Sequence, residues 1–281
     1  MRFVRYELGN AVGLGLEQDG VLRGLPVGEL PFSTLEAALQ ADQIEALAKA
    51  LSPAPEVDVE LITYLPPLQR PGKIICVGLN YADHTIESKY EQPDYPTLFN
   101  RFSTSLIGHG QSLVKPSFSN SFDFEGEMVA VIGKPGRSIS KADALSHVAG
   151  YSVFNDGSVR EYQFKAPQWT VGKNFDDTGA FGPAFVTADE LPSGGTGLKI
   201  ETRLNGEVMQ SATTSDMIFS VADCIHIISE AITLEAGDII VSGTPAGIGW
   251  ARDPKVLMQQ GDVCEVEVEG IGLLRNPVVE V

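Results

Sequence analysis

The sequence has little cysteine, little positive charge and no long apolar run. Its three cysteines lie far apart, which excludes a disulfide framework or a cysteine-rich zinc site and favours reduced, buried thiols. Lysine and arginine number 20 against 37 acidic residues, and the net charge of −17 argues against nucleic acids and anionic membranes as partners. No apolar stretch approaches the roughly 18 residues of a membrane span, and the N-terminus lacks the apolar core of a signal peptide. We therefore expect a cytoplasmic protein.

The 281 residues, 43% of them hydrophobic, have an ordinary globular composition that divides near residue 70. In the first part, Ser33 with Glu36 predicts a capped helix, which the sequence breaks after Asp42. Prolines then punctuate the chain up to residue 71. We predict a small α+β domain over residues 1–70 and a second domain over residues 71–281. Short strands are expected in the first part at 2–7, 12–17 and 21–24.

The second part is rich in strands. Its strongest candidates are 73–77, 127–132, 149–155, 199–204, 238–242 and 263–268. Two helices are predicted, one opened by Ser140-x-x-Asp143 and a longer one by Ser220-x-x-Asp223. Helices do not alternate regularly with the strands, which argues against a doubly wound parallel sheet. The fold class predicted is therefore α+β and strand-rich.

Acidic side chains mark the candidate metal site. Glu125 and Glu127 are two residues apart at the start of an apolar strand, so period-two alternation places both carboxylates on one face. Alone, such a pair is also typical of a solvated strand end. Asp156, at the end of another apolar strand, would add a third carboxylate. Three carboxylates without histidine or thiolate favour a hard ion, Mg²⁺ or Mn²⁺, over zinc.

Two further groups carry candidate chemistry. Arg160 and Gln163 lie four and seven residues beyond Asp156, and an arginine beside a metal suits a substrate carboxylate because its fork binds bidentately. His84 and Glu87 are three residues apart, so on a helix their side chains can meet and the carboxylate raises the basicity of the imidazole. Each pattern is also compatible with a simple surface pair on a helix.

Five motifs in continuous order resemble the fumarylacetoacetate hydrolase family over residues 70–281. They are Gly78-x-Asn-Tyr-Ala-Asp-His84-x-x-Glu87, Phe124-Glu-x-Glu127, Asn155-Asp156-x-Ser-x-Arg160, Trp169-Thr-x-Gly-Lys173 and Ser242-Gly-Thr-Pro245-x-Gly247. The resemblance implies a mixed β-roll of several sheet layers, a small leading domain and a homodimer. The sequence departs from the family pattern at Gly157, where members of the family mostly carry a bulkier residue. This difference predicts a looser pocket wall.

The resemblance also implies roles for individual residues. Glu125, Glu127 and Asp156 match the family's metal carboxylates, which would hold one Mg²⁺ or Mn²⁺. The segment with His84 and Glu87 matches a catalytic dyad on a lid. Lys173 matches a catalytic lysine near the metal. The positions that match substrate contacts for a 2-oxo acid are Arg160, Gln163 and Thr244.

Three functions remain open on the sequence alone. The main prediction is metal-dependent hydrolysis of a C–C bond in a 2,4-dioxo acid, an acylpyruvate or a diketo-deoxy sugar acid, giving pyruvate and a carboxylic acid. The alternative is decarboxylation, tautomerisation or isomerisation of oxaloacetate-like or aromatic-catabolic 2-oxo acids. The third is a metal-binding or scaffold protein that has lost catalysis. The presence of every motif residue argues against this third function.

Overall fold

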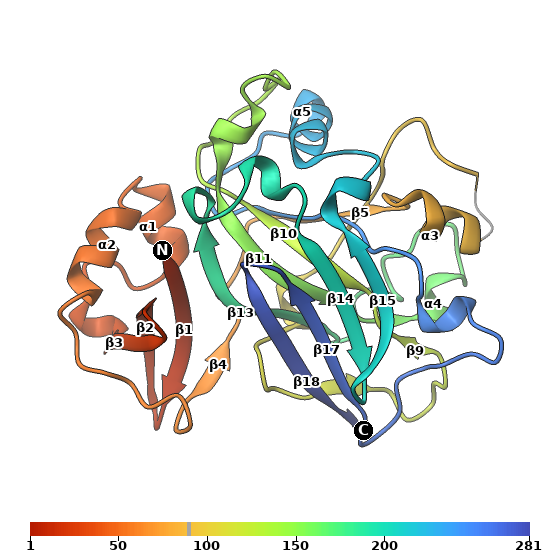
Figure 1. The fold of residues 1–281 in the computed structure, drawn as a ribbon, viewed down its shortest axis with the longest axis horizontal. Coiled ribbons are helices and arrows are strands. Elements are labelled where there is room, and N and C mark those ends of the chain that lie inside the picture. The colour runs from red at the N-terminus through yellow and green to blue at the C-terminus, as the bar shows by residue number, and fades with distance from the viewer. Residues whose placement is uncertain (89–90) are drawn as a thin grey trace.

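The computed structural model describes residues 1–88 and 91–281 and is built around one large mixed sheet (Figure 1). Nine strands form its main path, in the order β3-β2-β1-β13-β11-β10-β16-β5-β6. Two short strands pair beside this path, β4 (Thr63–Leu65) with β1 and β7 (Leu106–Ile107) with β13. The bounds of the nine, in sheet order, are Val21–Pro26, Ala11–Gln18, Arg2–Leu8, Gly179–Thr187, Val148–Asp156, Gly126–Ile132, Ile239–Val241, Ile74–Gly78 and Thr97–Asn100.

A second sheet of five strands packs against the first. Its order is β15-β14-β17-β18-β8, with bounds Glu207–Thr213, Lys199–Leu204, Val263–Val268, Gly272–Glu280 and Leu113–Lys115. A two-stranded ribbon joins β9 (Phe122–Asp123) to β12 (Ser158–Val159). This strand-rich α+β architecture of several sheet layers confirms the predicted fold class.

Strand β10 lies in the middle of the layers and is buried on both faces. Met128 and Ala130 point into the core shared with the five-stranded sheet and with α5 (Val221–Ala231). Val129 and Val131 point into the opposite core, which α1 (Leu35–Gln40) and α2 (Ile44–Leu51) cover. Alternation along the strand therefore fixes the face on which Glu127 lies, the same face as Val129.

The N-terminal segment joins the large sheet through its first strand. Strand β1 pairs antiparallel with β13, with Phe3 opposite Phe185. Strand pairing therefore crosses the division expected at residue 70, and the two-domain division stays a prediction. The break into two helices is as expected, but the first N-cap is Thr34, which accepts a hydrogen bond from the Ala37 N–H, and not Ser33.

The remaining helices agree in part with the sequence. Ser220 and Asp223 form the capping box of α5 as predicted. Ser140 and Asp143 instead form a hydrogen-bonded turn that leads to a short 3₁₀ segment, Ala144–His147. All three cysteines are free and buried, as expected. Within residues 1–88 and 91–281, no helix is long and apolar enough to span a membrane.

Candidate active site

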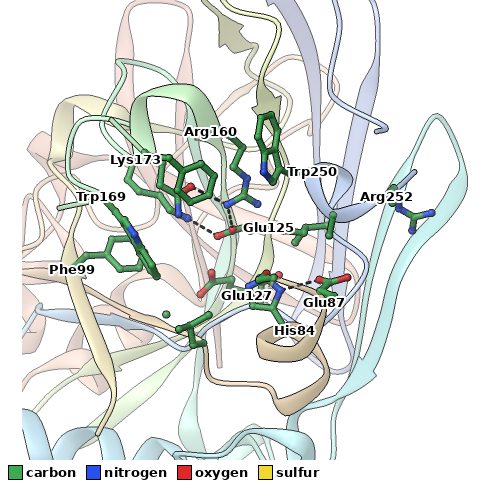
Figure 2. A pocket seen from close by; sticks show the side chains of 18 of the residues that line it. His84, Glu87, Phe99, Glu125, Glu127, Arg160, Trp169, Lys173, Trp250 and Arg252 are labelled. Atoms are coloured by element: carbon green, nitrogen blue, oxygen red, sulfur yellow. Dashed lines mark hydrogen bonds and ion pairs between the residues drawn. The ribbon is translucent and has the colours of Figure 1, made fainter. Parts of the chain in front are cut away.

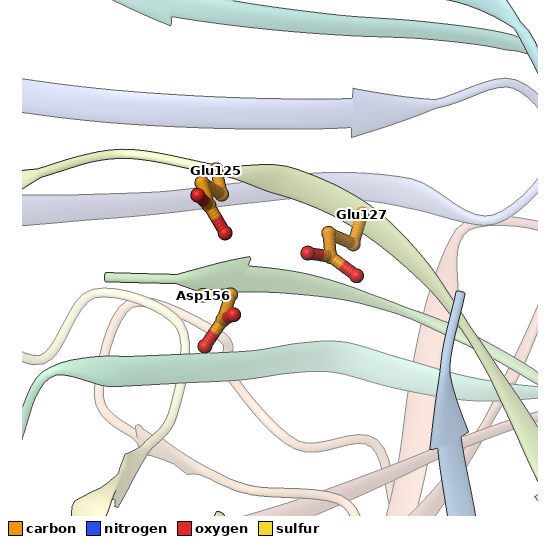
Figure 3. Close-up of side chains that lie close together, drawn as sticks. All are labelled: Glu125, Glu127 and Asp156. Atoms are coloured by element: carbon orange, nitrogen blue, oxygen red, sulfur yellow. The ribbon is translucent and has the colours of Figure 1, made fainter. Parts of the chain in front are cut away.

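Three buried carboxylates converge where β10 and β11 lie side by side (Figure 3). The strands pair with Gly126 opposite Asn155, and the Asp156 N–H donates to the Glu125 carbonyl at 2.8 Å. One oxygen from each of Glu125, Glu127 and Asp156 lies within 4.8 Å of the other two. Buried carboxylate oxygens this close are a suitable donor set for Mg²⁺ or Mn²⁺, since like charges otherwise repel in a poorly solvated site.

Two buried cations balance part of this negative charge. Lys173 Nζ lies 2.6 Å from Glu125 Oε2 and 2.7 Å from Asp156 Oδ2, and Arg160 Nη1 lies 2.6 Å from Glu125 Oε1. Burial alone would raise the pKa of Glu125, but Arg160 and Lys173 hold it well below its usual range. Burial, then the charges of Asp156 and Glu125, raise the pKa of Glu127. The cluster therefore has room for further positive charge beside Glu127.

The candidate dyad lies on α3 (Ala82–Glu87), directly after β5. His84 Nδ1 is 2.9 Å from Glu87 Oε1, the contact expected for residues three apart on a helix. The Gly247 N–H also donates to both Glu87 oxygens, at 3.0 and 2.9 Å. With Nδ1 held by the carboxylate, Nε2 is the ring nitrogen left to exchange a proton with substrate or water. Part of the expected lid, residues 89–90, lies outside the described residues.

The three candidate substrate contacts are close to the carboxylates but already engaged. Arg160 opens α4 (Arg160–Gln163), and its Nη1 donates to Gln163 Oε1 at 2.9 Å. Thr244 Oγ1 donates to the Gly126 carbonyl at 3.0 Å and accepts from Gln210 Nε2 at 2.8 Å. These contacts fix the side chains beside the cavity before any substrate arrives.

Asp123 is a buried site residue that the sequence reasoning missed. Its Oδ2 accepts from Arg160 Nε at 2.9 Å and Nη2 at 2.7 Å. Its carboxylate also accepts from the Gly249 and Trp250 N–H groups at 2.9 and 3.0 Å. The Nε–Nη2 edge of the Arg160 guanidinium is therefore bound to Asp123 and is not free to bind a substrate carboxylate in a bidentate manner. The feature of the sequence that could have identified Asp123 is its position between two aromatic residues, Phe122 and Phe124, both of which are buried.

Asp123→Asn should weaken substrate binding more than it slows turnover. The amide keeps the shape but loses the charge that holds Arg160 and the loop at Trp250, and a hydrogen bond to a charged group contributes about 1.5–3 kcal/mol. We expect KM to rise about 10-fold or more while kcat changes less. Steady-state kinetics of purified Asp123→Asn measure both, and a fall confined to kcat would contradict this role.

Eight of the nine candidate residues line one cavity of about 490 Å³ (Figure 2). The ninth, Asp156, is not part of the lining, but its Oδ2 contacts Lys173, which is. Phe99 and Trp169 lie on one side of the cavity and Trp250 and Arg252 on the other, and the dyad lies below Glu125 in the view of Figure 2. Gly157 is not part of the lining, so the expectation of a looser wall is wrong. A Cβ on Gly157 would come within 2.1 Å of the Thr178 carbonyl oxygen, which makes glycine necessary for packing.

Comparison with known proteins gives the same family as the motifs. The family model described as fumarylacetoacetate (FAA) hydrolase C-terminal matches residues 73–279. A rat protein named mitochondrial oxaloacetate tautomerase Fahd2a is 38% identical over 99% of this chain and 92% of its own length. The human protein named mitochondrial oxaloacetate tautomerase FAHD2A is also 38% identical, with the same coverage of both chains.

Solved structures agree with this assignment. A fumarylacetoacetate hydrolase from Exiguobacterium antarcticum superposes with a TM-score of 0.90 at 34% identity, and the match covers both chains completely. A 5-carboxymethyl-2-hydroxymuconate delta-isomerase from Mycobacterium smegmatis gives 0.78 at 29% identity, again over both whole chains. Sequence and fold agree over the whole length, so this chain belongs to the fumarylacetoacetate hydrolase family and is an enzyme of that family.

Proposed function

We propose that this enzyme interconverts the keto and enol forms of oxaloacetate or a close 2-oxo acid. Two observations together support the proposal. The chain is 38% identical to named oxaloacetate tautomerases over 99% of its length, and one cavity is lined by the dyad and by Glu125 and Glu127 of the carboxylate cluster. The main prediction from sequence was C–C hydrolysis. The relatives favour the alternative, tautomerisation, which needs no attacking water.

The cavity's residues can carry out the required proton transfer. A divalent ion held by Glu125, Glu127 and Asp156 would polarise the 2-oxo carbonyl. His84 Nε2 takes a proton from C3, the C–H electron pair becomes the C2–C3 double bond as the carbonyl π pair moves onto the 2-oxo oxygen, and the protonated imidazole returns the proton to that oxygen to complete the enol. Glu87 stabilises the protonated imidazole through Nδ1. Lys173 adds positive charge where the oxygen becomes negative.

Hydrolysis of a 2,4-dioxo acid is the second candidate because the cavity has room for it. A volume of about 490 Å³ walled by Phe99, Trp169 and Trp250 would hold an acyl group beyond the 2-oxo acid end. In that reaction His84 would deprotonate a water that attacks the distal carbonyl. The dyad serves both reactions, so its geometry does not separate them.

A substrate panel separates the two candidates. Oxaloacetate, acetylpyruvate and a longer acylpyruvate are each incubated with enzyme and Mg²⁺ or Mn²⁺, and enol decay, pyruvate and carbon dioxide are followed. We expect faster keto–enol interconversion of oxaloacetate with little pyruvate from any substrate. Rapid release of pyruvate and a carboxylic acid from an acylpyruvate, with no effect on oxaloacetate tautomers, would establish the hydrolase instead.

We also propose a homodimer. Large apolar side chains are exposed around Asn174 and Phe175: Phe102 at 54%, Phe118 at 65% and Val171 at 59%. An apolar patch of this kind on a folded protein marks an interaction surface, and a second copy would cover it. Sedimentation equilibrium at micromolar concentration should give twice the monomer mass of 30.1 kDa. A monomer under these conditions would contradict the prediction.

Cytoplasmic location stays a prediction. The rat and human relatives are named as mitochondrial proteins, so the predicted compartment of this chain differs from theirs. The expected absence of nucleic-acid and membrane partners also stays a prediction and rests on the acidic composition.

A further inference from the structure

Arg101 is a buried cation, 2% exposed, that lies directly behind the carboxylate cluster. It follows β6, and its guanidinium spreads over four acceptors. Nη1 contacts Asp156 Oδ1 and also donates to the Gly157 carbonyl at 3.1 Å. Nη2 donates to Thr178 Oγ1 at 2.9 Å and Nε to Ser105 Oγ at 3.2 Å. Arg101 is not among the residues that line the cavity, so it does not meet a substrate.

The fold leaves space for this guanidinium by omitting a side chain. A Cβ built on Gly179 would lie 2.7 Å from Arg101 Nη2 and 2.9 Å from both Cζ and Nε. Gly179 pairs with Asp156 across β13 and β11, so the missing side chain is directly beside the carboxylate that Arg101 holds. The position of the guanidinium is thus determined by packing on one side and by hydrogen bonds on the other.

The two oxygens of Asp156 have different partners. Oδ2 shares Lys173 Nζ with Glu125 Oε2, so these two oxygens face one another across the cluster. Oδ1 faces Arg101 on the far side. A carboxylate gripped through one oxygen presents the other in a fixed direction, which is how residues behind a metal ligand orient it.

We infer that Arg101 is a positioning residue of the metal centre, which holds Asp156 Oδ1 so that Oδ2 alone points at the ion. The inference rests on the metal site of the proposed function and names a residue that acts through Asp156. Its charge works against its role, because a nearby cation repels Mg²⁺ or Mn²⁺. If Arg101 acts by orienting Asp156, its removal should weaken metal binding. If its charge dominates, its removal should strengthen metal binding.

The first test measures Mn²⁺ binding to the wild type, Arg101→Met and Arg101→Lys, by the electron paramagnetic resonance signal of free Mn²⁺. Removal of a group that orients a metal ligand costs about 10- to 100-fold in affinity. We expect a loss of this size in Arg101→Met and a smaller loss in Arg101→Lys, which keeps charge but not the fork. Unchanged or tighter binding by Arg101→Met would overturn the inference.

The second test retains Arg101 in the sequence but displaces its guanidinium group. Gly179→Ala should displace the guanidinium and weaken Mn²⁺ binding in the same direction, although every charge is retained. Gly28→Ala is the matched control, since nothing lies within 4 Å of a Cβ there. If Arg101→Met does not fold by circular dichroism, Gly179→Ala decides, and wild-type affinity in that variant overturns the inference.

These outcomes separate the inference from the proposed function. Wild-type protein that binds no Mn²⁺ would overturn the metal site itself, and the role of Arg101 with it. Wild-type protein that binds Mn²⁺ as tightly as Arg101→Met would overturn only the role of Arg101. Neither readout depends on which 2-oxo acid the enzyme uses.

Discussion

Glu127→Ala is expected to abolish measurable Mg²⁺ or Mn²⁺ binding and to lower activity about 10³-fold or more, since a metal ion contributes several kcal/mol to transition-state stabilisation. Glu127 is the best of the three carboxylates to replace. Its Oε2 accepts from the Gly243 N–H at 2.5 Å, and no cation of the described chain forms an ion pair with it. Replacing Glu125 would instead release Arg160 and Lys173 as well.

Isothermal titration with Mn²⁺ and an activity assay with and without chelator check this result. Glu267→Gln is the control, because Glu267 is half-exposed on the five-stranded sheet and pairs with Arg203 away from the cavity. The control should bind metal as the wild type does. Stoichiometric, tight Mn²⁺ binding by Glu127→Ala, or full wild-type activity in excess chelator, would show that the acidic cluster is not the functional metal site.

His84→Ala should lower turnover about 10²- to 10⁴-fold, the usual range for a positioned general base. Its affinity for Mn²⁺ should barely change, because His84 is not one of the three carboxylates proposed to hold the ion. Glu87→Ala should act in the same direction but less, since Glu87 holds the imidazole and does not itself meet the substrate proton. Single-turnover kinetics and Mn²⁺ titration together check both statements.

His226→Ala is a suitable comparison for the dyad. His226 lies on α5, outside the cavity, and its Nδ1 contacts the Ile139 carbonyl oxygen at 2.7 Å. The His226→Ala variant should therefore retain its activity per folded molecule. Loss of metal from His84→Ala would make His84 a ligand and not a base. Near-normal turnover in that variant would assign the proton transfer to another group.

Local patterns in the sequence were sufficient to place the acidic cluster. Glu125 directly precedes β10 and Glu127 lies within it, and side chains two residues apart on an extended chain share a face, a rule that needs no partner strand. The His84–Glu87 contact likewise follows from helix spacing alone. Motif order identified the family, which in turn gave the layered, strand-rich fold.

Residues whose role depends on distant partners could not be found this way. Arg101 reaches Asp156, 55 positions away in the chain, because β7 soon after it pairs with β13, and β13 pairs with β11. Strand β13 itself was missed, since Gly182 and Pro183 interrupt its apolar pattern. The choice between tautomerisation and hydrolysis was beyond the motifs, because the same dyad serves a carbon acid or a water.

Hydrogen exchange at C3 of oxaloacetate tests the central claim most directly. Proton NMR in D₂O follows the loss of the C3 signal with Mg²⁺ and either wild-type enzyme or His84→Ala. The account predicts fast exchange with the wild type, at least about 10²-fold slower exchange with His84→Ala, and no parallel formation of pyruvate. Exchange no faster than Mg²⁺ alone, or equal in the two proteins, would contradict it.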